Sequence, residues 1–225
     1  LGVIFEWDPA TNVYTKKIDL NSADGCNPYG SLTLNGVKFY GMTNLGGTND
    51  KGVIFEWDPV SNQYSKKIDF GTTNGENPFG RLTYFNGMFY GMTRNGGTNN
   101  FGVIFEWDPV NNLYSKKIDF LGNGKPLGYL TAYGNKLYGM TNTALGGGGG
   151  SVFEWDPSTN SLSYKVNYNG GPYQRFVGSL TMKDGKFYGM VGGGTHGFTY
   201  LPGNVFEWDP VTNTIMYMIS FNIIN

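Results

Sequence analysis

The chain has 225 residues, one cysteine and a formal net charge of -1. This charge gives no basis for a nucleic-acid or membrane surface built on bulk charge, and one cysteine excludes an internal disulfide or a cysteine-based zinc site. Charged residues make up only 15%, whereas glycine, tyrosine and phenylalanine are abundant. No apolar run of about 18 residues is present, so we expect no membrane-spanning helix.

A repeated segment begins at the second residue of the chain. GVIFEWDP at 2–9 recurs unchanged at 52–59 and 102–109, with shorter forms at 151–157 and 204–210. The tryptophans of these segments are 50, 50, 48 and 53 residues apart. A period near 50 is typical of the four-stranded blades of a β-propeller. We therefore expect an all-β propeller of antiparallel blades.

The predicted elements divide the chain into one half blade and four complete blades. Residues 1–20 supply only strands three and four of a blade. The complete blades are expected at 31–70, 81–120, 129–167 and 179–220. The ring would be five-bladed if about 30 further residues completed the half blade, and would otherwise be larger. We expect the chain to be part of a longer protein.

Each complete blade is predicted to contain four strands. In the first blade these are SLTL (31–34), KFYGMT (38–43), VIFEW (53–57) and the stretch that ends in KKIDF (66–70). Asn35-Gly36 and its counterparts tolerate the positive φ angles of a type I′ hairpin turn. The Asp-Pro-x-x-Asn stretches form the next turn, since proline fixes φ and the Asp and Asn side chains bond nearby backbone.

Alternating strand directions place the connections on two faces. Short turns follow strands one and three on one face, and long loops follow strands two and four on the other. The long loops differ in length and content while the strands barely change. Variable loops on a rigid scaffold are the usual place for binding, so we expect a binding site on the loop face.

Several of these elements in register resemble a known family. The order NPYG-x-L, FYGMT, GG and GVIFEWDP, ending in KKIDF, resembles the GloVer-type (Gloeobacter/Verrucomicrobium) β-propeller repeat of bacterial surface and secreted proteins. The matching residues are Gly80, Leu82, Phe89, Tyr90, Gly91, Thr93, Gly96, Gly97, Gly102, Ile104 and Phe105, with a closing Phe70 or Phe120 and Asp24-Gly25-Cys26-Asn27-Pro28. Kelch repeats are more distantly similar. Val191 in place of the threonine and an insertion at 170–178 depart from the pattern.

The resemblance implies a location and no established chemistry. Proteins with such repeats are exported by bacteria, so it implies an extracellular or outer-membrane-associated protein. It implies no catalytic residue and no cofactor.

The repeated Glu-Trp-Asp segment has two competing interpretations. Acid chemistry beside a stacking tryptophan would suit a sugar-cleaving site. However, a catalytic centre in a propeller is a single asymmetric place, whereas this segment occurs five times. We therefore expect Trp7, Trp57, Trp107, Trp155 and Trp208 to form the repeated core between blades. Glu6 should pair with Lys16 or Lys17 of strand four, although Glu207 has no lysine in TIMYMIS (214–220).

Residues outside the repeat are the better candidates for binding. The candidates are Tyr29, Phe79, Arg94, Tyr173, Arg175, His196 and Tyr200, all of them in predicted loops. Aromatic rings beside asparagine and arginine suit sugars, whose apolar faces stack on rings while hydroxyls bond amides. The alternative is that Tyr29, Phe79 and Leu127 only seal the gaps between blades.

No cofactor is expected. Asp24 and Asp50 could offer oxygen ligands to calcium, but neither loop has the dense Asp/Asn alternation of a strong calcium site. Copper or zinc would need more histidines or cysteines than the chain contains.

These observations lead to three hypotheses. The first is a non-catalytic exported propeller that binds a glycan or protein partner at the cell surface. The second is a structural or spacer module in a larger surface protein or assembly. The third is a polysaccharide-active enzyme, which would need unpaired carboxylates near the channel mouth.

Overall fold

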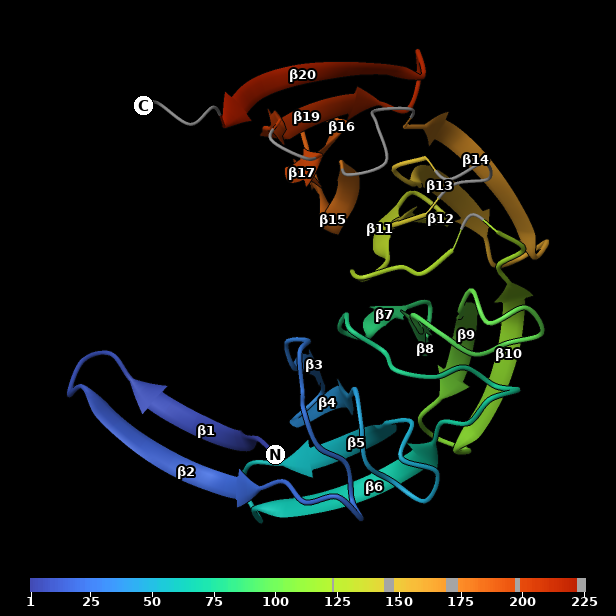
Figure 1. The fold of residues 1–225 in the computed structure, drawn as a ribbon. Helices are drawn as coiled ribbons and strands as arrows, with labels where there is room; N and C mark the ends of the chain where they lie inside the picture. Colours follow the sequence, from blue (N-terminus) through green and yellow to red (C-terminus); the bar gives the residue numbers. More distant parts are fainter. Residues whose placement is uncertain (123, 144–147, 169–173, 197–198, 222–225) are drawn as a thin grey trace.

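A computed structural model describes residues 1–122, 124–143, 148–168, 174–196 and 199–221. These residues form strands, turns and loops and contain no helix, so none of their segments is a helix long and apolar enough to cross a bilayer. Figure 1 shows radial sheets arranged along an open arc, with β1 (Val3–Asp8) and β2 (Val13–Asp19) at one end. The fold is a β-propeller whose sheets do not close into a ring.

Four antiparallel four-stranded sheets follow the two-stranded one. The first is β3 (Thr33–Asn35), β4 (Lys38–Thr43), β5 (Val53–Asp58) and β6 (Gln63–Asp69). The second is β7 (Thr83–Phe85), β8 (Met88–Met92), β9 (Val103–Asp108) and β10 (Leu113–Asp119). The third is β11 (Thr131–Tyr133), β12 (Lys136–Thr141), β13 (Ser151–Asp156) and β14 (Ser161–Asn167). In each sheet the strands are adjacent in chain order.

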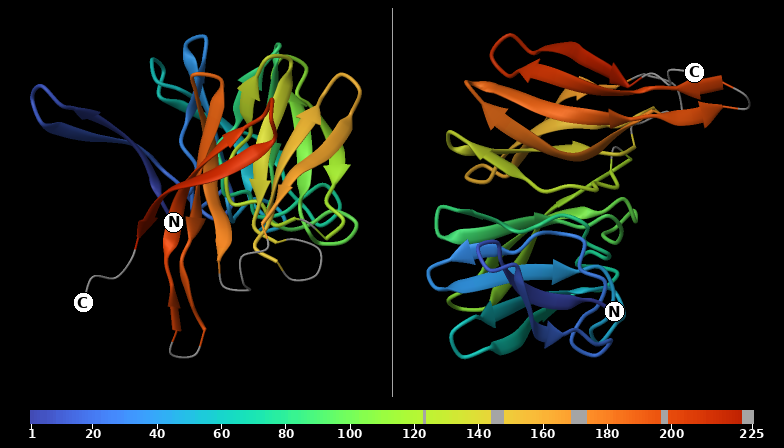
Figure 2. Two further views of the ribbon diagram at one scale, coloured as in Figure 1. Left: turned by 90° about the horizontal axis from the view of Figure 1, so that it is seen from above. Right: turned by 90° about the vertical axis from the view of Figure 1, so that its left-hand side faces the viewer.

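The fourth sheet differs from the repeat in two places. It contains β15 (Arg175–Lys183), β16 (Lys186–Gly192), β19 (Gly203–Asp209) and β20 (Thr214–Phe221). β15 begins at Arg175, before the position 179 that the repeat predicts, because residues 175–177 pair with the lengthened β16. The long loop expected after strand two of this blade instead contains β17 (Gly194–His196) and β18 (Thr199–Leu201), which pair as a hairpin projecting from the sheet (Figure 2).

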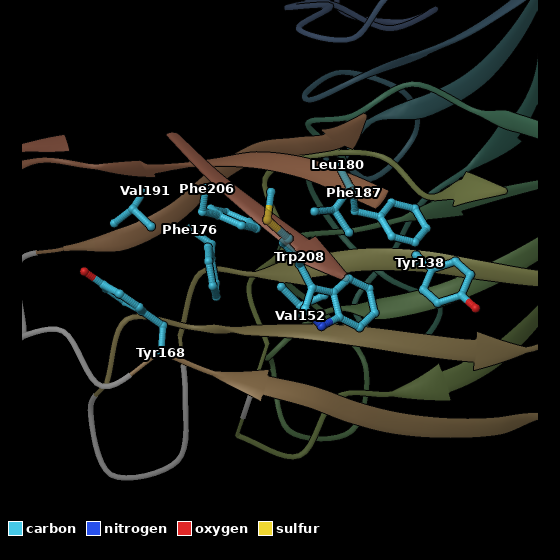
Figure 3. Close-up of a cluster of buried hydrophobic side chains, with 10 residues drawn as sticks. Tyr138, Val152, Tyr168, Phe176, Leu180, Phe187, Val191, Phe206 and Trp208 are labelled. Carbon is cyan, nitrogen blue, oxygen red and sulfur yellow. The ribbon is translucent and has the colours of Figure 1, made fainter. Parts of the chain in front are cut away.

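Adjacent blades pack through two different faces. One face carries the tyrosine and methionine of strand two, as in Tyr40 and Met42. It packs against the phenylalanine and tryptophan face of the next blade, where Phe89 and Trp107 lie. Figure 3 shows the same arrangement around Tyr138, Phe187 and Trp208. Each interface between two complete blades therefore buries two complementary aromatic faces, which contribute apolar burial to stability.

The Trp-Asp-Pro-x-x-Asn segment links one blade to the previous one. Asn112 has a φ of 55°, in the left-handed region that asparagine tolerates. Its Oδ1 accepts a hydrogen bond of 3.0 Å from Trp107 Nε1, and its Nδ2 donates to the carbonyl oxygen of Lys67 in the preceding blade. The same two bonds recur at Asn62, Asn160 and Asn213. The segment therefore joins two adjacent blades through its asparagine, and we call it the structural clip.

The tryptophan of the half blade is an exception to the predicted core. Trp107, Trp155 and Trp208 are fully buried and Trp57 is nearly so, but Trp7 is 54% exposed. It keeps the hydrogen bond from Nε1 to Asn12. The difference arises because no described sheet packs on the face of β1 and β2 that carries Phe5 and Trp7.

The inner strands approach one another at the glycine before strand one. A Cβ atom on Gly80 would lie 2.1 Å from the carbonyl oxygen of Gly128, and one on Gly30 would lie 2.3 Å from that of Gly80. Thr33 Oγ1 donates to the Leu82 carbonyl across the same junction, at 2.6 Å. These contacts bring the blades together around the axis, and they leave no room for a side chain.

Candidate functional site

The repeated glutamates are bonded by their own blade. Glu154 Oε1 accepts from Lys136 Nζ at 2.6 Å, and its Oε2 accepts from Tyr138 Oη at 3.0 Å. Glu106 accepts from Tyr90 and pairs with Lys117 of strand four. Glu207 pairs with Lys186 of strand two, which supplies the lysine that strand four lacks. Glu6 pairs with Lys17 and not with Lys16, which pairs with Asp19.

These contacts shift the pKa of glutamate side chains, as Glu154 shows. Burial opposes the charge of Glu154, but the hydrogen bonds from Lys136 and Tyr138 outweigh it and hold its pKa below the ordinary value. Burial, with the bonded Glu154 carboxylate, raises the pKa of the Tyr138 hydroxyl. A general acid would need the opposite shift in its carboxyl group. The arrangement suits a structural ion pair.

Stability should fall in acid because of these carboxylates. The depressed pKa of Glu154 means that its contribution is fully present above the unfolded value, about 4.3, and is lost as pH falls through the lower folded value. Urea unfolding at a series of pH values measures this decline. Glu154→Gln should be less stable than the wild type at pH 7 and should show a shallower decline in acid. An equally steep acid decline in Glu154→Gln would contradict this assignment.

Three of the predicted binding residues lie together on the loop face. The rings of Tyr29 and Phe79 stack with centroids 4.9 Å apart and planes 12° from parallel. The Arg94 guanidinium carbon lies 5.4 Å from the centre of the Phe79 ring. Tyr29 is 63% exposed, so one of its faces remains open to solvent. We call Tyr29, Phe79 and Arg94 the aromatic platform.

The loops that carry the platform residues are held together by hydrogen bonds from asparagine side-chain amides. Asn77 Nδ2 donates to the carbonyl of Asn44, and Asn44 Nδ2 donates to the carbonyl of Pro78. Asn95 bridges Asn77 and Lys125 through its own amide. These asparagine groups therefore hold the loops in place, whereas the sequence interpretation assigned such amides to a ligand.

A shallow cavity adjoins the exposed ring of Tyr29. Its volume is about 430 Å³, and it is lined by Leu1, Gly2, Val3, Asn27, Pro28 and Tyr29. Asn27 has a φ of 57° and donates its backbone N–H to the carbonyl of Leu1. The space beside the platform is thus bordered by backbone and apolar groups.

Three of the other predicted binding residues lie in the last blade. Arg175 begins β15, and its Nη1 donates to Asn142 Oδ1 at 3.4 Å. His196 and Tyr200 lie on the β17–β18 hairpin, opposite Thr199 and Thr195 respectively. Tyr173 lies outside the described residues. The six candidates within the described residues thus divide between the platform loops and the last blade.

A second cation–aromatic pair escaped the sequence prediction. The Arg81 guanidinium carbon lies 4.2 Å from the centre of the Tyr129 ring, in the next blade. Both residues follow the glycine before strand one, at positions where the other blades have Ser31 and Ser179. The replacement of serine by Arg81 and Tyr129 at these positions was the feature of the sequence that could have predicted the contact. The pair joins two blades near the axis.

The aspartates considered for calcium take part in turns. Asp50 Oδ1 accepts the backbone N–H of Gly46, and Asp24 Oδ2 accepts from Asn21 Nδ2. Among the described residues no group of three or more histidine, cysteine, aspartate or glutamate side chains is placed to hold a metal ion.

Comparison with known proteins identifies the repeat. A family model for the Gloeobacter/Verrucomicrobia repeat matches residues 1–124 and 82–225. TolB from Acinetobacter baumannii has a similar structure, with a TM-score of 0.58 over 96% of this chain and 14% sequence identity. The chain spans 48% of that structure, and at this identity the likeness concerns the fold alone. Curated protein sequences give no match.

Proposed function

The chain belongs to the Gloeobacter/Verrucomicrobia repeat family, and on that premise we propose that it is a non-catalytic propeller of an exported bacterial protein that binds a partner through its loop face. The partner is a glycan or a protein, and the aromatic platform favours a glycan. Export is supported by the resemblance to repeats of bacterial surface and secreted proteins.

The observation that carries this proposal is the open face of Tyr29. The Tyr29 ring stacks on the Phe79 ring, and the guanidinium carbon of the exposed Arg94 lies 5.4 Å from the centre of the Phe79 ring. A fixed aromatic ring presents apolar area with little loss of conformational freedom on binding. The apolar face of a sugar can stack on such a ring, and the arginine can donate hydrogen bonds to hydroxyl or carboxylate groups.

The absence of catalysis is supported by the paired state of the repeated glutamates. Each of Glu56, Glu106, Glu154 and Glu207 bonds a lysine of its own blade. An acid bonded in this way is a poor proton donor at neutral pH.

A structural or spacer role is the second candidate. The asparagine amides of the platform loops bond within the protein, as they would in a module that binds no small ligand. Under this hypothesis the Tyr29–Phe79 stack would only seal adjacent blades.

A glycan array with the intact chain tests the proposal, followed by affinity measurements on any ligand found. Tyr29→Ala should weaken binding by about tenfold or more, since it removes the exposed ring. Arg94→Ala should weaken binding to acidic glycans most. Tyr84→Ala is the matched control, because Tyr84 is 42% exposed on β7 near the opposite, short-turn face.

Two results would count against a binding role. One is the absence of any ligand across broad glycan and protein panels, which would favour the structural role. The other is an equal loss of affinity in Tyr84→Ala, which would place binding elsewhere.

A further inference from the structure

Three cations at the loop-face end of the second and third complete blades have no carboxylate partner among the described residues. They are Arg81 at the start of strand one, Arg94 in the loop after strand two, and Lys125 in the loop before the next strand one. By contrast, every lysine of strands two and four forms an ion pair with a carboxylate of its own sheet. Both blades are flanked on either side by a complete blade, so this environment does not depend on either end of the chain.

The three cations lie on chain segments that touch one another. Lys125 Nζ donates to Oδ1 of Asn95 at 3.1 Å, and Asn95 follows Arg94 in the sequence. The guanidinium of Arg81 contacts the ring of Tyr129, in the segment that begins at Lys125. Figure 1 shows strand one of these two blades, β7 and β11, on the inner side of the arc. The cations therefore gather where two adjacent blades meet near the axis.

Arg94 replaces an asparagine that bonds the next blade elsewhere. At the equivalent positions, Asn44 Nδ2 donates to the carbonyl of Pro78, and Asn142 Nδ2 donates to that of Phe176. The guanidinium of Arg94 makes no such bond to a described residue and lies beside a phenylalanine ring. Its N–H donors thus remain available to a ligand.

Lys125 occupies a backbone position that suits asparagine better. Its φ is 58°, and the equivalent Asn27 and Asn77 have φ values of 57° and 56°. Asparagine tolerates this left-handed conformation, whereas a lysine there is uncommon. An unfavourable backbone conformation of this kind is more frequent at functional positions. The fold alone would favour asparagine, so the charge of Lys125 is the property that distinguishes it.

The local acid does not neutralise these cations. Glu76, whose backbone pairs with Asn95, is buried, and its carboxylate bonds Lys51 at 3.2 Å. Contact with an aromatic ring restrains each arginine, and neither guanidinium forms a hydrogen bond to a described residue. This part of the loop face therefore presents restrained positive charge.

We propose that Arg81, Arg94 and Lys125 bind the carboxylate groups of an acidic polysaccharide whose sugar rings pack on the aromatic platform. Such binding rests on the glycan role proposed above, because Arg94 belongs to both groups of residues. Arginine donates through a planar fork that matches the two oxygens of a carboxylate. Cations from adjacent blades can contact carboxylates on different sugars of one chain. A nucleic acid fits less well, since three cations in a chain of net charge -1 give few phosphate contacts.

Calorimetric titration of the intact chain tests the proposal. The ligands are oligosaccharides of galacturonate, alginate and hyaluronan, each beside its carboxyl-reduced, neutral counterpart. We expect at least one acidic form to bind about tenfold or more tightly than its neutral form, and its affinity to fall as salt is added. No binding of any acidic form, or equal binding of acidic and neutral forms, would overturn the proposal.

Three variants return each cation to the residue found at equivalent positions of the repeat. Arg81→Ser, Arg94→Asn and Lys125→Asn should each weaken binding of the acidic oligosaccharide by about threefold to tenfold, and the triple variant should lose it. The new residues already occupy these positions in other blades, so the variants should fold, which thermal unfolding checks.

Lys183→Gln is the matched control. Lys183 is exposed and has no carboxylate partner among the described residues, but it lies beside the short turn between strands one and two. Its removal should leave the affinity unchanged. An equal loss in this variant would show unspecific attraction by charge and would overturn the proposed site.

The outcomes separate this site from the broader binding role. Binding of neutral glycans that all three reverted variants retain would overturn the carboxylate site and leave the proposed function standing. No ligand in broad glycan and protein panels would contradict both. Polyglutamate tests an acidic protein as the source of the carboxylates. If it bound more tightly than every acidic oligosaccharide, the polysaccharide would be the wrong ligand class.

Discussion

Trp107→Ala should lower the free energy of unfolding by about 3–5 kcal/mol, whereas Trp7→Ala should lower it by about 1 kcal/mol or less. Trp107 is fully buried between two blades, stacks with Phe89 and meets the edge of Tyr40. Removing the indole leaves a cavity and also removes the donor to Asn112. Trp7 makes the equivalent bond to Asn12 but is half exposed.

The two variants form a matched pair, because both tryptophans lie in the same eight-residue segment and both lose one hydrogen bond. Denaturant unfolding followed by circular dichroism measures the difference between them. Equal losses in the two variants would show that burial between blades is not the source of the stability. A stable Trp107→Ala that had lost only ligand binding would overturn the structural role of the tryptophan.

Gly80→Ala should also cost several kcal/mol, at or above the usual range of about 1–3 kcal/mol for overpacking. The added Cβ would lie 2.1 Å from the Gly128 carbonyl oxygen and 2.8 Å from the Tyr129 nitrogen. Both atoms belong to backbone, so no rotamer change can relieve the contact. The blades must separate at the axis, and the bond from Thr83 Oγ1 to the Leu130 carbonyl should break with them.

Gly36→Asn is the control for this change. Gly36 has a φ of 63° in a hairpin turn, and a Cβ there would meet nothing within 4 Å. Asparagine tolerates that conformation, so the unfolding free energy should change little. Thermal unfolding of the two variants makes the comparison. An unchanged melting temperature in Gly80→Ala would mean that the inner strands do not approach as closely as described.

The repeat made much of the fold predictable. A period near 50, an Asn-Gly hairpin signal and the alternation in Phe-Tyr-Gly-Met were enough to predict strand number, order and the two packing faces. The glycine of this segment is needed because a Cβ atom on Gly41 would lie 2.5 Å from the Phe55 ring. Sequence periodicity is informative here because every blade repeats the same contacts.

Exceptions arose where the repeat meets an end or an insertion. Trp7 was expected in the core, but burial depends on a neighbouring sheet that a local pattern does not reveal. Glu207 pairs with Lys186 of strand two, a partner that a comparison with strand four alone does not predict. The β17–β18 hairpin has no counterpart in the described residues of the other blades, so the internal repeat does not predict it.

The candidate site was only partly predictable for a related reason. Tyr29, Phe79 and Arg94 were predictable as candidates because all three lie in predicted loops on one face of the propeller, and the structure brings these three into contact. Arg81 and Tyr129 were missed, since their contact crosses two blades at positions that hold serine elsewhere. Contacts between unlike residues of different repeats leave no periodic trace in the sequence.

The clip formed by each Trp-Asp-Pro-x-x-Asn segment has an evolutionary consequence. Asn112, Asn160 and Asn213 each bond the strand-four carbonyl of the blade before them, so every repeat carries its own half of an identical head-to-tail joint. A duplicated repeat would bring a working joint with it and require no compensating substitution in its neighbours. Gene duplication can thus lengthen such an array one unit at a time, while selection acts separately on the loops.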